Sequence, residues 1–161
     1  MVQTTYGFNT PIGQAGGLYD LSPVEIDAFL NEAADGALKF GMGVVVGTGV
    51  GTGVAIPTAD SVAGDFEGIV VNRRTTENAL DGGPVIKNKA TVGVLRYGRI
   101  YGVLADGAAP TYGDAVYMVK SGEDAGCFTD SSSSTIAIKG RFLGGASDGI
   151  APIELFHQAQ S

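Results

Sequence analysis

Beyond Phe40, short hydrophobic runs alternate along the chain with Gly, Asp and Asn residues that favour turns. Runs rich in Val, Ile, Tyr and Thr between such turn signals are typical of β-strands. About ten short strands at this spacing predict a small β-barrel, β-tulip or sandwich. We expect these strands at residues 42–46, 53–56, 68–72, 85–87, 90–96, 99–105, 115–119, 127–129, 135–142 and 150–156.

Apolar and polar residues alternate most clearly between Thr135 and Phe142. Successive side chains of a strand point to opposite faces, so this period of two predicts one buried face and one wet face. The buried face would carry Ile136, Ile138, Gly140 and Phe142, and the wet face Lys139 and Arg141.

Residues 1 to about 40 show no sustained period of 2 or 3.6, and their large apolar side chains stand isolated among Gly, Pro, Asn and Gln. We interpret this stretch as an extended arm, residues 1–40, attached to a β body, residues 41–161. About 20 extended residues span on the order of 65 Å, which is enough to reach a neighbouring chain. The side chains that we expect to bind a surface are Tyr6, Phe8, Ile12, Leu18, Tyr19 and Leu21.

The segment 22–35 allows two interpretations. Ser22 as N-cap, Pro23 at the first helical position and Glu25 three residues after the cap favour one short helix that ends near Gly36. An extended strand is the alternative, with Ile26, Ala28 and Leu30 on one side and Glu25, Asp27 and Phe29 on the other.

The composition argues against several classes of function. The chain of 161 residues has a formal charge of −7 and a pI near 4.5, so it lacks the basic surface of a nucleic-acid binder, and binding to an acidic membrane is not expected either. The N-terminus has neither the basic start nor the apolar middle of a secretion signal. Because Cys127 is the single cysteine, no disulfide can form within the chain.

The glycine cluster from Gly47 to Gly53 invites comparison with phosphate-binding loops. A phosphate loop needs Gly-Lys-Ser/Thr before a helix, and a dinucleotide fingerprint would need a glycine where Thr52 stands. We therefore expect a flexible hairpin tip here.

Other candidate chemistry is sparse. The carboxylates fall mostly in turns, and no stretch matches a calcium-binding loop. One His and one Cys cannot supply a closed zinc site, and nothing marks a nucleophile that His157 could activate. We expect no enzyme activity, no cofactor and no metal, and interpret Cys127 as a small apolar residue within a strand.

Three segments resemble the structural cement, or capsid decoration, proteins of tailed bacteriophages: 31–34 (Asn-Glu-Ala-Ala), 40–47 (Phe-Gly-Met-Gly-Val-Val-Val-Gly) and 138–142 (Ile-Lys-Gly-Arg-Phe). The likeness extends to residues 6–9, 16–20 and 150–155, so it covers nearly the whole chain. None of these segments is a chemical motif, and the resemblance is carried by their order and spacing.

The resemblance implies a small β-barrel or β-tulip body on the exterior of the virion capsid, made in the host bacterial cytoplasm. There it would bind the major capsid protein of an expanded head and stabilise neighbouring subunits, commonly as a homotrimer, with a dimer as the alternative. Two other classes stay open from the residues alone: a tail-tube or tail-fibre component, and a small hydrolase or carbohydrate-binding module.

Overall fold

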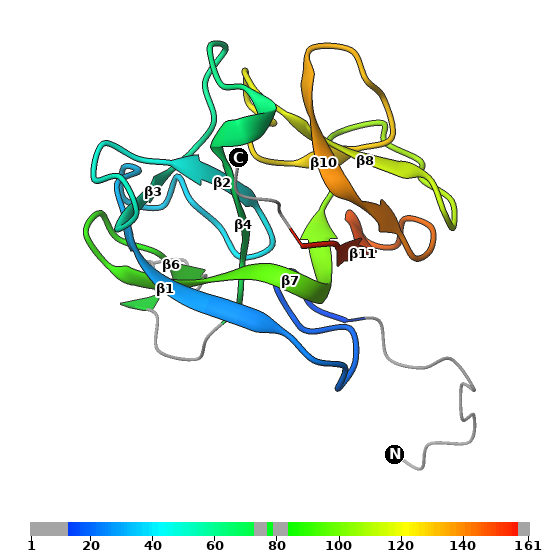
Figure 1. The fold of residues 1–161 in the computed structure, drawn as a ribbon, viewed down its shortest axis with the longest axis horizontal. Helices are drawn as coiled ribbons and strands as arrows, with labels where there is room; N and C mark the ends of the chain where they lie inside the picture. Colours follow the sequence, from blue (N-terminus) through cyan, green and yellow to red (C-terminus); the bar gives the residue numbers. More distant parts are fainter. Residues whose placement is uncertain (1–12, 73–76, 79–83, 158–161) are drawn as a thin grey trace, which may run out of the picture.

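A computed structural model of the protein describes residues 13–72, 77–78 and 84–157 (Figure 1). It is mainly β, as the sequence predicts. The strands are β1 (Glu25–Asn31), β2 (Gly43–Val46), β3 (Gly53–Ala55), β4 (Phe66–Val70), β5 (Glu77–Asn78), β6 (Pro84–Val85), β7 (Thr91–Val103), β8 (Ala115–Val119), β9 (Phe128–Thr129), β10 (Thr135–Phe142) and β11 (Ile150–Leu155), with one 3-10 turn, η1 (Ala63–Asp65), before β4.

Five strands close into a barrel. The sheet order runs β1-β3-β2-β4-β7, and an additional pairing between β1 and β7 completes the ring. Beyond the barrel, the sheet continues from β7 through β11, β10 and β8 to β9. Figure 1 shows β7 running from the barrel on the left to β11 on the right, so this strand joins the two halves of the molecule.

The barrel strands β2 and β4 and the barrel part of β7 bury both of their faces. Val44, Val54, Val70 and Val94 belong to one core cluster, together with Phe29 of β1. The residues next to them in the chain, Val45, Ile69 and Leu95, belong to a second cluster shared with strands β8 to β11. Strands that are covered on both faces need no polar alternation, which explains the continuous runs Val44–Val46 and Ile69–Val71.

The sequence predicts separate strands at 90–96 and 99–105 with a turn at Tyr97-Gly98 between them, and this turn is wrong, because β7 runs unbroken from Thr91 to Val103. Gly98 has a φ of +126°, and a Cβ there would lie 2.7 Å from Cγ1 of Val24. The glycine at this position therefore leaves room for the Val24 side chain against the sheet, where the sequence pattern suggested a chain reversal.

The helix expected within 22–35 is also wrong. Residues 25–31 form β1, which pairs antiparallel with β7 from Glu25↔Tyr97 to Leu30↔Thr91. Ile26 packs against one core cluster and Phe29 lies in the other, so both faces of the strand contact hydrophobic residues. Backbone pairing with β7 and burial on two sides outweigh the local preference for a helix.

Two local predictions are confirmed. In β10, Ile136, Ile138 and Phe142 are buried, while Lys139 is exposed on the opposite face. Gly47–Thr52 connects the antiparallel strands β2 and β3 and is a hairpin tip. The sequence also predicts a turn at Asp81-Gly82-Gly83, before the strand expected at 85–87, and these residues lie outside the described ones. Within the described part, no helix has the length and hydropathy needed to cross a membrane.

Candidate functional site

Residues 16–19, the root of the predicted arm, lie along β7 beyond the end of its pairing with β1. The N–H of Gly16 donates to Tyr101 O (2.8 Å), the N–H of Tyr101 donates to Gly17 O (2.9 Å), and the N–H of Tyr19 donates to Arg99 O (3.0 Å). Leu18 forms a β-bridge with Ile100. The root is therefore an added strand of the sheet, held in a defined register.

Gly16 makes this docking possible. It is buried, its φ is +73°, and a Cβ on it would lie 2.8 Å from both the amide nitrogen of Asn72 and the carbonyl oxygen of Val70. These neighbours are backbone atoms, which cannot move aside as a side chain could. The N–H of Asn72 donates to Gly16 O, so the root is also fixed to the segment after β4.

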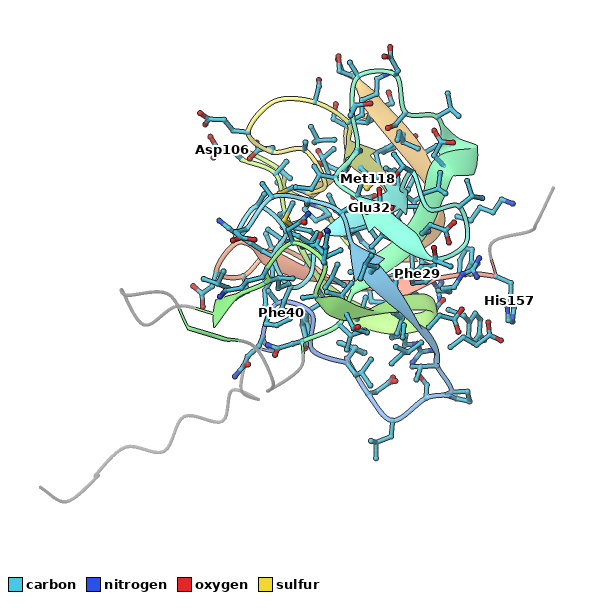
Figure 2. The ribbon with its side chains drawn as sticks, turned by 90° about the vertical axis from the view of Figure 1, so that its left-hand side faces the viewer. Phe29, Glu32, Phe40, Asp106, Met118 and His157 are labelled. Atoms are coloured by element: carbon cyan, nitrogen blue, oxygen red, sulfur yellow. The ribbon has the colours of Figure 1, made fainter. Side chains whose placement is uncertain are left out.

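Between the root and β1, the chain leaves the sheet and returns to it. Residues 20–24, here called the finger, separate the pairing of Leu18 with Ile100 from that of Glu25 with Tyr97. Figure 2 shows this stretch as the blue loop that projects from the lower edge of the body. Leu21 in the finger is 103% exposed, and no other large hydrophobic residue in the described part is as exposed.

The carboxylate of Asp20 holds the finger in shape. It accepts hydrogen bonds from the backbone N–H of Ser22 (2.9 Å), from Oγ of Ser22 and from Nη1 of Arg99 (2.8 Å). The bonds from Ser22, followed by that from Arg99, lower the pKa of Asp20 to about 2. The same carboxylate helps to raise the pKa of Arg99, after the larger effect of Glu154. The finger is therefore a preorganised projection.

A ladder of charges crosses the outer face of the sheet next to the finger. Arg141, Glu154 and Arg99 lie opposite one another on β10, β11 and β7. Nε of Arg99 is 2.7 Å from Oε2 of Glu154, and Nε of Arg141 is 3.1 Å from Oε1 of the same residue. With Asp20, the ladder has two guanidinium and two carboxylate groups, so its charges cancel.

Aromatic rings flank this ladder. Tyr19 and Tyr101 lie with ring centroids 5.6 Å apart, and His157 stacks on Tyr97 at 4.0 Å. The Arg141 guanidinium carbon lies 5.4 Å from the centre of the Tyr112 ring. Tyrosine and arginine are enriched in protein-protein interfaces, and this outer face has that composition.

A cleft of about 280 Å³ lies between the finger and the end of β11. It is lined by Ser22, Pro23, Tyr97, Gly98, Arg99, Glu154, Leu155 and Phe156. Phe156 is 44% exposed, so the cleft has an apolar, ring-lined side next to the charged ladder.

Of the residues predicted for the arm, Leu18, Tyr19 and Leu21 are exposed, and Tyr19 and Leu21 lie beside this face. Tyr6, Phe8 and Ile12 lie outside the described residues. Sequence reasoning missed Tyr97, Arg99, Tyr101 and Phe156. Tyr97, Arg99 and Tyr101 are spaced by two, which would have placed them on one face if the turn at Gly98 had not been assumed.

The glycine tip, Gly47–Gly53, holds an anion from the chain itself. The carboxylate of Glu32 accepts hydrogen bonds from the N–H of Thr48 (2.7 Å), Oγ1 of Thr48 (2.9 Å) and the N–H of Gly49 (2.9 Å). These bonds, that from Gly49 first, lower the pKa of Glu32. A Cβ on Gly47 would lie 2.6 Å from Cδ of Glu32, so the glycine leaves room for this carboxylate.

The remaining candidate chemistry finds little support. The described residues contain no group of three or more His, Cys, Asp or Glu side chains that could hold a metal ion. Burial raises the pKa of the Cys127 thiol to about 11, in agreement with a structural role. His157 is 68% exposed and lies 3.9 Å from Glu25.

The closed β-barrel thus presents a hydrogen-bonded finger beside an aromatic, charge-balanced face, a composition typical of protein-binding surfaces. The sequence matches the family described as "Structural cement protein (E217 gp24/Pam3 gp6)" over residues 2–156, and the chain belongs to this phage family. It is thus a structural protein of the phage capsid, with a role in its decoration and stabilisation.

The fold is similar to that of a solved chain in "The capsid of Myoviridae Phage XM1", with a TM-score of 0.72, 22% identity and 96% of each chain covered. No curated protein matches the sequence. Neither the family nor the structural match favours the tail or carbohydrate-binding alternatives.

Proposed function

We propose that this protein binds the outer surface of the expanded phage head, where it contacts the major capsid protein and stabilises the contacts between neighbouring capsid subunits. Residues 1–22 act as the main capsid-binding arm, with Tyr6, Phe8, Ile12, Leu18, Tyr19 and Leu21 as its anchors. The protein works by binding alone, without catalysis.

The docked root of the arm is the observation that carries this proposal. An arm can hold a partner under load only if its base is fixed to its own domain. Here the root has three backbone hydrogen bonds to β7 and one to Asn72, and Gly16 packs directly against backbone atoms. A load on residues 1–15 would therefore pass into the central strand of the fold and the two cores beside it.

Exposed large hydrophobic residues at the root would add to the contact between the arm and the capsid. Leu18 and Tyr19 are each 41% exposed, and Leu21 is more exposed still. Aromatic and leucine anchors next to arginine are a common source of binding free energy at protein interfaces. Self-association into a small oligomer and many copies on one shell would multiply modest single contacts.

Head binding can be measured directly by mixing the purified protein with undecorated expanded heads. We expect saturable co-sedimentation and heads that withstand higher temperature. A variant that lacks residues 1–12 keeps every described contact and should bind at least tenfold more weakly. Val50→Asp, which changes an 82% exposed residue at the glycine tip, is the matched control and should bind normally.

The outcomes separate the parts of the proposal. No binding by the full-length chain would contradict the function itself. Equal binding by the variant without residues 1–12 would contradict the arm alone and would transfer the contact to the described body.

A further inference from the structure

The aromatic ring of Tyr101 lies directly against the point where the arm joins the body. Gly13 packs on this ring so closely that a Cβ on Gly13 would overlap Cε2 and Cδ2 and would lie 2.5 Å from Cζ. We propose that Tyr101 is a positioning residue, whose ring sets the direction in which residues 1–12 leave the body and so presents them to the capsid. This inference rests on the proposed function and adds to it the side chain that aims the arm.

Tyr101 also holds the chain through its backbone, which bonds to Gly16 and Gly17. Between these two residues and Gly13 the chain turns back on itself. The N–H of Gly17 donates to Gln14 O (2.8 Å), and Gly16, the third residue of this turn, has the positive φ that a type II turn requires at that place. The turn brings Gly13 onto the ring of the same residue whose backbone fixes Gly17. Tyr101 therefore contacts the arm on both sides of the turn.

The ring of Tyr101 is itself firmly placed. Tyr101 lies inside the sheet, with the root of the arm on one side and Pro152 of β11 opposite it on the other. The ring of Tyr19 lies 5.6 Å away, centroid to centroid. Because its backbone is paired on both sides, the ring can direct the chain that crosses it, whereas a ring on a loop would move together with that chain.

Glycine at position 13 is what permits this contact. Any other amino acid would place its Cβ among the ring atoms, so the chain would have to lift off the ring or the ring would have to turn. Gly16 meets backbone atoms and therefore fixes where the root docks. Gly13 meets a side chain instead, so the exit of the arm depends on the residue present at position 101.

A fixed exit direction matters because the arm is long. Twelve extended residues span on the order of 40 Å, so a small change of direction at the base is multiplied along the arm. An arm that already points toward its site loses less conformational freedom when it binds. Tyr101 and Arg99 share one face of β7, so the arm starts from the face that carries the charged ladder. Arm and body can therefore meet one capsid surface together.

NMR of the free full-length protein, with isotope-labelled glycine, tests the contact without heads. The ring current of Tyr101 should displace the amide signal of Gly13, and this signal should show an ordered backbone. Tyr101→Phe keeps the ring and should keep both properties. Tyr101→Ala should abolish the displacement and increase the motion of Gly13. A Gly13 signal that is the same in Tyr101→Ala as in the wild type would overturn the proposal.

Co-sedimentation with undecorated expanded heads tests the consequence. Tyr101→Ala should bind at least fivefold more weakly, whereas Tyr101→Phe should bind as the wild type does. Tyr117→Ala, at another half-buried tyrosine within a strand, is the matched control and should bind normally. Gly13→Ala should also weaken binding, and Gly64→Ala, where a Cβ meets nothing within 4 Å, should not. In the Tyr101→Ala protein, Gly13→Ala should have no further effect, because its methyl group no longer meets a ring.

Removal of the arm separates aiming from direct contact. In the protein that lacks residues 1–12, Tyr101→Ala should leave the remaining head binding unchanged, because there is no arm to direct. An equal loss with and without residues 1–12 would mean that Tyr101 itself contacts the capsid, and would overturn the positioning role. So would a full-length Tyr101→Ala protein that binds as well as the wild type. Failure of the wild type to bind heads would instead contradict the proposed function, and the aiming of the arm with it.

Discussion

The finger and the glycine tip are two projecting loops, and each is held by a hydrogen-bonded carboxylate. In each, one carboxylate of the chain accepts three hydrogen bonds, Asp20 in the finger and Glu32 in the tip. Asp20 is local to its loop, but Glu32 comes from the residue after β1 and lies 16 residues before Thr48. The carboxylate that holds the finger thus belongs to the loop itself, whereas the carboxylate that holds the tip comes from the residue after β1.

Their surroundings differ more than their fastening. The finger presents Leu21 beside tyrosines, a charge-balanced ladder and a cleft. The tip presents Val50 among glycines and threonines. A rigid exposed apolar residue is therefore insufficient to indicate an interface, and it is the face next to the finger that makes Leu21 a candidate anchor.

Asn31 fixes the end of β1, next to the Glu32 that binds the glycine tip, and its replacement should cause the largest loss of stability. It is fully buried, its Nδ2 donates to Lys87 O (2.9 Å), and its Oδ1 accepts from the N–H of Ala33 (2.9 Å). Asn31→Leu should lower the free energy of unfolding by about 3 kcal/mol, because the carbonyl of Lys87 and the N–H of Ala33 lose their partners at a partly buried site. Chemical denaturation measures this, with Asn88→Ala at an exposed asparagine of the same region as the milder control.

Gly16→Ala should break the finger side at the root of the arm. The added methyl would meet backbone atoms of Asn72 and Val70, and φ would stay positive for a residue with a Cβ. We expect a loss of about 1–3 kcal/mol, or release of residues 13–19 from β7. Hydrogen exchange at the amides of Tyr19 and Tyr101 distinguishes the two. Unchanged exchange and stability would show that the close packing of Gly16 is unimportant.

Gly53→Ala should detach the Glu32 carboxylate from the glycine tip. Its Cβ would collide with Oε1 of Glu32, so the carboxylate must leave the loop. The expected cost is about 1–3 kcal/mol in thermal or denaturant unfolding. Gly64→Ala is the matched control, since nothing lies within 4 Å of a Cβ there. A loss for Gly64→Ala of equal size would mean that the contact with Glu32 is not the cause.

Acid should weaken both loops. The pKa of Asp20 falls from 3.8 to about 2 on folding, so its contribution is present above pH 3.8 and is lost as the pH falls toward 2. The lowered pKa of Glu32 has the same sign, starting from 4.5. Asp20→Asn and Glu32→Gln should each lower Tm modestly at pH 7 and flatten its fall below pH 4.5. A steeper acid fall in either variant would contradict the assignment.

The smallest effects on folding should come from the tips themselves. Leu21→Asp and Val50→Asp alter exposed side chains, so each should change the free energy of unfolding by less than about 0.5 kcal/mol. The two variants should differ only in head binding. Circular dichroism with denaturant provides the comparison, and a large loss for Leu21→Asp would mean that Leu21 has a packing role in the monomer.

Sequence reasoning alone determined the features that depend on near neighbours. It placed the strands 115–119 and 135–142 at their observed limits, assigned the wet face of β10 and recognised the hairpin tip at Gly47–Gly53. Alternation and turn chemistry act over two to four residues, so one sequence contains the whole signal.

Only the tertiary structure decided the features that join distant segments. Residues 25–31 form a strand because they pair with β7. Gly98 lies within a strand where the Val24 side chain comes close to it. Glu32 binds the glycine tip across 17 residues of sequence. Arg99 and Asp20, whose contact defines the finger, are 79 residues apart. Such pairs form only when the chain closes on itself, and no local pattern records which distant partner will be chosen.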